Sequence, residues 1–230
     1  MRNLAIIPAR SGSKGLADKN IKDLCGKPML VYTIEAALKA NVFEEVMVST
    51  DSEYYAIIAK KNGAKVPFLR SDKNSTDNSS SWDVVYETIS NYYKQNRIFD
   101  TFMLLQPTSP LRDEKDICGA ISEYKEKDAC AVVSVCEAEH SPVYMNILPE
   151  SIDMGSFFGD YKWTRRQDLP KYYRLNGAIY MSDVGSFMKY KDIYREKCFA
   201  YIMSRMHSVD IDSDLDFLYA ETIINNGGRL

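Results

Sequence analysis

The sequence contains little histidine, and its cysteines show no pairing pattern. Only 2 of the 230 residues are histidines, His140 and His207, and they lie too far apart in the sequence for a zinc-binding motif. The 5 cysteines are an odd number without a Cys-x-x-Cys motif, a pattern typical of free thiols in a reducing cytoplasm. We therefore predict that both histidines are structural and that the cysteines are thiols of the protein core.

Long hydrophobic runs and an excess of basic charge are also missing. The first apolar run, residues 4–8, is too short for a signal-peptide core or a membrane span, and no other run approaches such a length. The 29 basic and 32 acidic side chains leave a formal charge of 29 − 32 = −3, which argues against general binding to nucleic-acid backbones. We expect a soluble, cytoplasmic protein that binds neither membranes nor nucleic acids.

The composition is otherwise that of a globular domain. Hydrophobic residues make up 45% and charged residues 27% of the chain, which excludes a disordered or low-complexity protein. At ~150 residues per domain, the length predicts one large domain over residues 1–230. A chain of this size buries roughly 70% of its unfolded surface, so it needs no disulfide or structural metal.

Short apolar runs alternate with segments of helical periodicity along most of the chain. The runs predict strands, and the periodic segments predict helices. Predicted strands cover residues 3–9, 45–49, 65–69, 101–105, 129–136, 178–181 and 199–203, and predicted helices cover 28–40, 52–62, 82–93, 114–126 and 215–225. Because strand–helix–strand units form right-handed crossovers, this alternation predicts an α/β sandwich with a mostly parallel sheet.

The alternation stops over residues 137–173. This stretch contains prolines, glycines and scattered aromatic side chains but no clear period. Such a long irregular segment in a compact domain usually has a functional or partner-binding role. Its apolar content indicates that it packs against something, for which a second subunit is one candidate.

The loop after the first predicted strand, residues 8–20, is rich in glycine, serine and basic side chains. Residues 1–30 hold 6 basic and 2 acidic side chains, a local charge of 6 − 2 = +4. The loop matches neither a Walker sequence nor a Gly-x-Gly-x-x-Gly sequence, but it could hold phosphates at the carboxyl end of its strand. A solvated turn is the equally acceptable alternative. The residues suited to phosphate are Arg10, Ser11, Gly12, Ser13, Lys14, Gly15 and Lys19.

Four aspartates lie within residues 210–216. In an extended segment Asp210 and Asp212 project to the same side, where two carboxylates could hold Mg²⁺. Asp214 and Asp216 are better explained as residues of a helix start capped by Ser213.

Two further segments carry polar side chains with two possible interpretations. Gln106 follows the predicted strand 101–105 and could contact a sugar or a base, although a structural turn with Arg112 at the surface is the simpler interpretation. The adjacent Arg165 and Arg166 could clamp a carboxylate or a phosphate, but such pairs are also common on ordinary surfaces.

Taken together, these segments resemble the acylneuraminate cytidylyltransferases, the bacterial CMP-sialic acid synthetases. The first loop is also similar to that of the related 3-deoxy-manno-octulosonate cytidylyltransferases. The segments Arg-Arg-Gln-Asp (165–168) and Asn-Gly-Ala-Ile-Tyr (176–180), however, resemble those of the sialic acid enzymes. The resemblance runs nearly end to end and keeps its order along the chain. It rests on residues 7–15, 19–21, 26–28, 48–51, 70, 79–81, 105–112, 165–168, 174–180 and 208–212.

The resemblance implies a three-layer sandwich with a mostly parallel, Rossmann-like nucleotidyltransferase sheet and a small dimerisation extension at residues 137–173. It also implies a homodimer, in which this extension reaches the neighbouring subunit's site. The implied reaction converts CTP and sialic acid (N-acetylneuraminate) into CMP-sialate and pyrophosphate, with Mg²⁺ as cofactor and the sugar 2-hydroxyl attacking the α-phosphate. A related nonulosonate such as legionaminate is the alternative substrate.

Residue by residue, the resemblance implies four groups of functional side chains. The catalytic group is Lys19, Arg165 and Arg166, and which arginine faces the substrate stays open. The nucleotide-binding group is Arg10, Ser13, Lys14, Asn20, Arg70, Ser79 and Ser81. The substrate-binding group is Gln106, Arg174 and Tyr180, and the metal ligands are Asp210 and Asp212.

Two other classes of function are weighed against this enzyme. A non-catalytic nucleotide- or sugar-binding module would keep the fold without turnover. Nothing in the motifs favours such a module, because the proposed metal carboxylates and the cations of the first loop are both present. A Rossmann dehydrogenase would need the glycine fingerprint that the first loop lacks.

Overall fold

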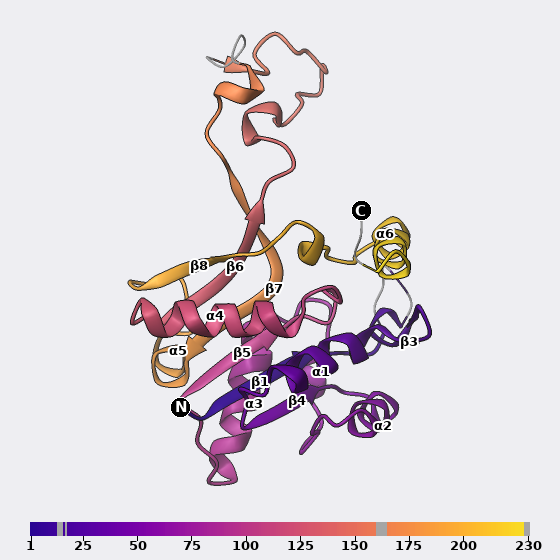
Figure 1. Cartoon of the computed structure of the whole chain (residues 1–230), viewed down its shortest axis with the longest axis vertical. Helices are drawn as coiled ribbons and strands as arrows, with labels where there is room; N and C mark the ends of the chain where they lie inside the picture. Colours follow the sequence, from indigo (N-terminus) through magenta and orange to yellow (C-terminus); the bar gives the residue numbers. More distant parts are fainter. Residues whose placement is uncertain (13–15, 17, 160–164, 228–230) are drawn as a thin grey trace.

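The computed structural model describes residues 1–12, 16, 18–159 and 165–227 (Figure 1). Its centre is a six-stranded sheet with the strand order β4-β1-β5-β7-β6-β8. Only β7 is antiparallel to its neighbours, so the predicted α/β fold with a mostly parallel sheet is confirmed. The strands are β1 (Asn3–Pro8), β4 (Glu45–Ser49), β5 (Thr101–Leu105), β6 (Ala131–Glu137), β7 (Tyr173–Asp183) and β8 (Cys198–Ile202). A separate two-stranded hairpin is formed by β2 (Asp23–Leu24) and β3 (Lys27–Pro28).

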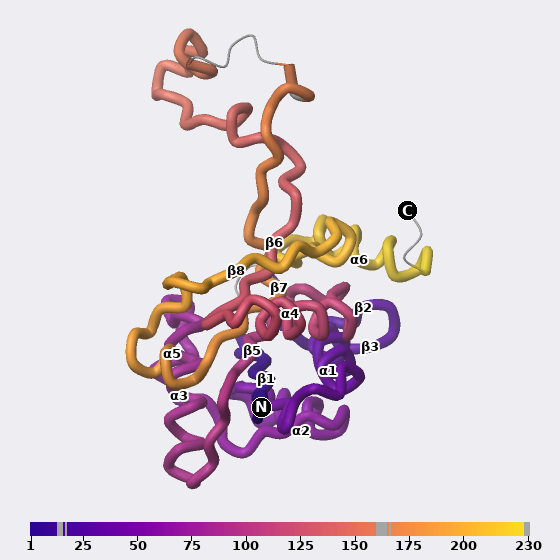
Figure 2. The backbone as a smooth tube through the Cα atoms, turned by 60° about the vertical axis from the view of Figure 1, so that its left-hand side comes forward, coloured from indigo at the N-terminus to yellow at the C-terminus, as the bar shows by residue number. Residues whose placement is uncertain are grey.

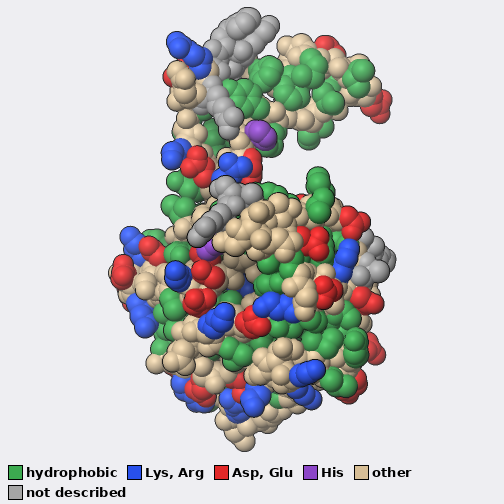
Figure 3. Space-filling model, turned by 45° about the vertical axis from the view of Figure 1, so that its right-hand side comes forward, with side chains coloured by type: hydrophobic (Ala, Val, Ile, Leu, Met, Phe, Trp, Pro, Cys, Tyr) green, Lys and Arg blue, Asp and Glu red, His purple; other side chains and the backbone are tan. Residues whose placement is uncertain are grey.

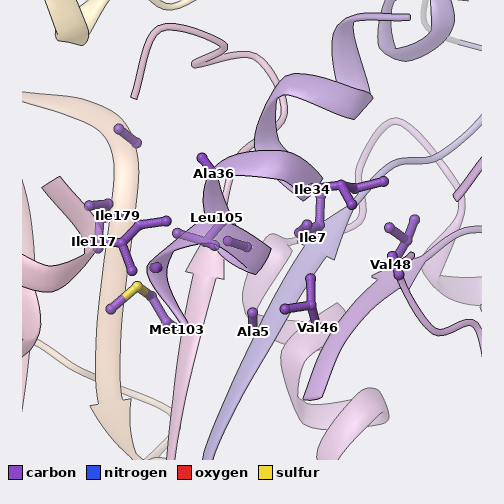
Figure 4. Packing of buried hydrophobic residues seen from close by; sticks show 14 of the residues in the cluster. Ala5, Ile7, Ile34, Ala36, Val46, Val48, Met103, Leu105, Ile117 and Ile179 are labelled. Carbon is purple, nitrogen blue, oxygen red and sulfur yellow. The ribbon is translucent and has the colours of Figure 1, made fainter. Parts of the chain in front are cut away.

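Helices cover both faces of this sheet, which makes three layers. Along β1, Ala5 and Ile7 face one hydrophobic cluster while Leu4 and Ile6 face the other, as the two-residue period of a strand requires. The first cluster includes α1 (Met29–Ala40), α2 (Glu53–Lys61) and α4 (Glu114–Glu126), and Figure 4 shows Ile34 and Ile117 packing onto its strands. The second includes α3 (Ser81–Lys94) and α5 (Val184–Tyr190).

The last helix, α6 (Asp214–Asn225), packs beside the first loop and the hairpin. Its buried Phe217 and Ala220 join Leu24 and Met29 in a third hydrophobic cluster. Ser213 caps this helix and exchanges hydrogen bonds with Asp216 in a capping box, as predicted. The same cluster includes Leu16, so α6 lies next to the loop that follows β1.

Two local predictions differ from the structure. Residues 65–69 do not form a strand, because the parallel pairing with β4 is limited to one bridge at Lys65 and Pro67 has no amide hydrogen to continue it. The helix α5, which Asp183 caps, was not predicted. It has two turns, too few for its periodicity to stand out in the sequence.

The described residues 138–159 and 165–172 form an arm that stands clear of the body, between the end of β6 and the start of β7 (Figures 1 and 2). Hydrophobic side chains are exposed on much of it, as Figure 3 shows, and Ile147 is 91% exposed. A folded chain rarely exposes so many apolar side chains on one segment without a partner to cover them.

None of the helices in the described part of the chain has the length and hydrophobicity needed to cross a membrane. All 5 cysteines are free thiols, as their spacing predicted, but only Cys136 is fully buried in the core and the other four are half-buried.

Candidate active site

A polar cavity of about 310 Å³ lies at the carboxyl ends of β1 and β5, where Pro8 and Gln106 leave the sheet. Ligands of parallel sheets bind at this edge, because loops from several strands converge there. The cavity collects many of the residues that the sequence predicted for nucleotide, metal and sugar. Those that line it are Arg10, Lys19, Asn20, Arg70, Ser79, Ser81, Gln106 and Asp212.

The first loop is held in place by polar contacts to the sheet and to its own far end. Asn20 Nδ2 donates to the carbonyl oxygen of Arg10 at 3.0 Å. Ser11 donates from its amide nitrogen and its hydroxyl to Asp51, at 2.8 and 2.7 Å. Burial raises the pKa of Asp51, but these hydrogen bonds outweigh it and leave the pKa below its ordinary value. The predicted Ser13 and Lys14 lie outside the described residues.

Lys19 joins the first loop to the acidic segment near the end of the chain. Its Nζ donates to Oδ1 of Asp212 and to the carbonyl oxygen of Ile211, both at 2.8 Å. The amide of Ile211 in turn donates to the carbonyl oxygen of Thr108 in the loop after β5. Cations and carboxylates from both ends of the sequence thus share one edge of the sheet.

Asp210 is half-buried, and its buried Oδ1 has no hydrogen-bond partner among the described residues. Burial raises its pKa, and the negative charge of Asp212 raises it further. Gly177 lies beside this carboxylate, and its φ of +75° is a backbone conformation that favours glycine.

The chemistry of these two aspartates suits a magnesium ion, and their assignment as its ligands stays a prediction. A buried carboxylate oxygen without a hydrogen-bond partner is costly, and a divalent cation would relieve that cost. Mg²⁺ takes oxygen ligands, commonly from one or two carboxylates and from substrate phosphates. Asp210 supplies the unpartnered oxygen, and Asp212 supplies a side chain that is 77% exposed beside the cavity.

Arg174 lies in a neighbouring cavity of about 430 Å³, together with Asp210. Its guanidinium forms a forked pair with Glu139, with two N–O distances of 3.1 Å. These hydrogen bonds lower the pKa of Glu139 to about 2. The structure therefore does not bring Arg174 together with Gln106, and its role in substrate binding stays a prediction.

Tyr180 lines a third pocket of about 250 Å³ with Trp82 and Tyr194. Ser81 and Gln106 line both this pocket and the polar cavity, and Gln106 Nε2 donates to Ser81 Oγ at 3.2 Å. Gln106 therefore stands where the two spaces meet.

Residues 107–111 form turns, as the structural interpretation of this segment predicted, but the predicted surface position of Arg112 is wrong. The side chain is buried, with 1% of the residue exposed, and Nη1 donates to the carbonyl oxygens of Gln106 and Ala178. Burial lowers the pKa of Arg112 to about 10. The cation ties the loop after β5 to β7, a pairing that the order of residues does not reveal.

Arg165 and Arg166 lie on the arm. Arg165 Nε lies 3.6 Å from Oδ2 of Asp168, both side chains are exposed, and Arg165 does not line the polar cavity. Arg166 begins a short 3₁₀ turn, and its side chain lies outside the described part of the structure. Their assignment to a site is an expectation that this chain alone does not test.

The residue-level predictions missed several side chains of the cavity. Asn74 and Thr76 line it, and Asp77 pairs with Arg10 at 2.7 Å. The signal for them was weak, because residues 71–80 contain only the polar composition of an ordinary loop.

Comparisons with known proteins show the family to which this chain belongs. A cytidylyltransferase family model matches residues 4–220. An N-acylneuraminate cytidylyltransferase of Streptococcus agalactiae serotype III (strain NEM316) is 39% identical over 224 residues, covering 95% of this chain and 52% of the relative. The chain thus spans about half the length of that relative.

A relative of similar length and a solved structure complete the comparison. The CMP-N,N'-diacetyllegionaminic acid synthase of Legionella pneumophila subsp. pneumophila (strain Philadelphia 1 / ATCC 33152 / DSM 7513) is 35% identical over 231 residues, covering 97% of each chain. The structure of a CMP:2-keto-3-deoxy-manno-octonic acid synthetase complexed with CTP is similar in fold, with a TM-score of 0.74 at 15% identity, covering 99% of this chain and 100% of that chain. The resemblance seen in the sequence is confirmed, and the chain belongs to the cytidylyltransferase family.

Proposed function

We propose that this chain transfers the cytidylyl group of CTP to a nonulosonic acid, with N-acetylneuraminate as the first candidate, and releases pyrophosphate. The observation that carries this proposal is the ion pair between Lys19 and Asp212 at one cavity. In this arrangement Lys19 would bind phosphate next to a carboxylate suited to a divalent metal, and such a site would suit a triphosphate.

The cavity can bind and orient the nucleotide without any covalent intermediate. Arg10 and Lys19 would neutralise the phosphates, while Asn20, Arg70, Ser79 and Ser81 would hold ribose and cytosine. Arg70 is fixed for this task, because its Nε donates to Ser49 Oγ at 3.1 Å at the end of β4. Such positioning lowers the activation free energy, because the reactants lose their translational and rotational entropy on binding and not in the transition state.

Asp210 and Asp212 would hold the magnesium ion. When bound, Mg²⁺ would withdraw negative charge from the pyrophosphate leaving group. Lys19 donates to Asp212 and faces the same cavity, so it would keep that carboxylate in place and contribute positive charge.

The sugar acid would enter beside Gln106, between the polar cavity and the Tyr180 pocket. Gln106 can donate and accept hydrogen bonds, which suits the hydroxyl groups of a sugar. From there the 2-hydroxyl would attack the α-phosphate in line with the departing pyrophosphate. Arg174 would contribute to binding of the sugar acid from the neighbouring cavity.

Legionaminate is the second candidate substrate, and one observation favours it. The legionaminic acid synthase is 35% identical to this chain over 231 residues. These sugar acids differ at peripheral substituents, so a few side chains in the pocket decide between them.

The arm would form the interface of a cytoplasmic homodimer. Its apolar side chains stand clear of the body, and a second copy would bury them. Arg165 or Arg166 of one subunit would then contribute a catalytic cation to the site of the other.

The test measures pyrophosphate release from CTP and Mg²⁺ with a panel of nonulosonic acids. N-acetylneuraminate should support release, and the ratio of kcat/KM between it and legionaminate identifies the preferred acid. Binding of CTP without release with any acid would support a sensor module and contradict the proposed reaction.

A further inference from the structure

The segment from Ser71 to Ser80 forms one wall of the polar cavity. Asn74, Thr76 and Ser79 line the cavity, and Arg70 precedes them directly. None of the residues from 71 to 80 is buried. Apolar packing therefore does not hold this wall, and polar contacts must determine its shape.

Some of these contacts lie within the wall segment itself. Ser79 Oγ donates to the carbonyl oxygen of Lys73 at 3.1 Å and accepts from the amide of Thr76 at 3.1 Å. Ser75 Oγ donates to the carbonyl oxygen of Ser71 at 2.8 Å. These bonds shape the segment but do not attach it to the body of the protein.

Attachment to the body comes from Glu87 on α3. Its Oε1 accepts a hydrogen bond from the amide of Ser71 at 3.0 Å, and its Oε2 accepts one from Asn74 Nδ2. The carboxylate thus fixes the backbone at the start of the wall and a side chain that lines the cavity. Further along the wall, Asp77 pairs with Arg10 at 2.7 Å.

We infer that Glu87 is a positioning residue for the nucleotide. Glu87 does not line the cavity itself, so it acts through Ser71 and Asn74. Because hydrogen bonds to a charged acceptor are stronger than neutral ones, one carboxylate can hold both contacts at the cavity edge. This inference rests on the proposed function, since it requires that the cavity binds CTP.

The test compares CTP binding by the full chain, its Glu87→Gln variant and its Asp83→Asn variant, by calorimetry. Glu87→Gln keeps the side-chain shape but removes the charge and one of the two acceptors. Asp83→Asn is the matched control, because it removes an exposed carboxylate one turn away on the same helix. Among the described residues, no hydrogen bond joins the Asp83 side chain to the wall.

We expect Glu87→Gln to bind CTP about tenfold more weakly, which corresponds to about 1.4 kcal/mol. The KM for CTP should rise by the same factor, while the KM for the sugar acid and kcat change by less than about twofold. Asp83→Asn should bind CTP like the wild type.

Equal CTP affinity of Glu87→Gln and the wild type would overturn the inference. A Glu87→Gln variant with a lower melting temperature and a changed KM for both substrates would also overturn the inference. Those changes would indicate that Glu87 stabilises the fold as a whole. Failure of the wild type to bind CTP would instead overturn the proposed function, and this inference with it.

Discussion

Lys19 Nζ and Asp212 Oδ1 lie 2.8 Å apart although the two residues are 193 positions apart in the sequence. The pair closes one side of the polar cavity and joins the basic loop to the acidic segment. Turnover and stability of an Asp212 variant can test this arrangement.

The first prediction concerns Asp212→Asn. The side chain is 77% exposed, so its loss should change the free energy of unfolding by less than about 0.5 kcal/mol. Turnover should fall by about 100-fold or more, because Asp212 both contacts Lys19 and is a proposed metal ligand. Pyrophosphate release over a titration of Mg²⁺ is the measurement.

Asp214→Asn is the control for Asp212→Asn, since Asp214 is exposed at the start of α6 and pairs with Lys22. Near-normal turnover of Asp212→Asn at saturating Mg²⁺ would remove Asp212 from the metal site.

The second prediction uses Asp210 as a reporter of metal binding. Because burial and the negative charge of Asp212 disfavour the ionised form of Asp210, the neutral Asp210→Asn should stabilise the metal-free protein by roughly 1 kcal/mol while abolishing most activity. Adding Mg²⁺ should raise the melting temperature of the wild type but not that of the variant. An equal response of both proteins to Mg²⁺, in calorimetric melting with EDTA-treated samples as baseline, would contradict the assignment.

The third prediction is a pH dependence of stability at His207. Its Nδ1 lies 2.7 Å from Oδ2 of Asp116, and this hydrogen bond raises the pKa of His207 above its ordinary value of 6.5. The protonated form is therefore favoured in the folded state. Its contribution is complete below the unfolded pKa and is lost as pH rises through the higher folded pKa.

The measurement for His207 is the unfolding free energy of wild type and His207→Gln from below pH 6 to above pH 8. The difference between the two should be largest at the acidic end and shrink as pH rises. His140→Gln, on the exposed arm, is the control and should follow the wild type. A difference that is constant with pH would show that the Asp116 contact does not depend on protonation.

The fourth prediction concerns the arm. Ile147→Asp places a charge at an apolar side chain of the arm that is 91% exposed, and if a second copy covers this side chain, the variant should sediment as a monomer. Turnover should fall by roughly tenfold or more, because the partner's arginine would leave the site. Ile57→Asp on α2, where the side chain is 62% exposed, is the control and should leave the assembly unchanged. A variant at Ile147 with the mass and turnover of the wild type would exclude this interface.

Much of the architecture could be predicted because it depends on local patterns. The boundaries of β4, β5 and α4 coincide with the predicted ones, since apolar runs and the capping residue Asp113 are local signals. The segment 65–69 was assigned wrongly for the same reason, because its apolar run could not show that pairing ends at Pro67. The antiparallel insertion of β7 between β5 and β6 also has no local signal.

The alternation of strands and helices, the basic first loop and the pair Asp210 and Asp212 could all be recognised from the order of residues. They depend on periodicity and on residue chemistry, which are visible within short stretches of the chain. The contacts between distant groups could be seen only in the folded protein. The tertiary structure placed Lys19 against Asp212, buried Arg112 between two carbonyl oxygens, and attached the cavity wall to Glu87. Such contacts depend on how the strands are ordered in the sheet, and that order results from the packing of the whole chain.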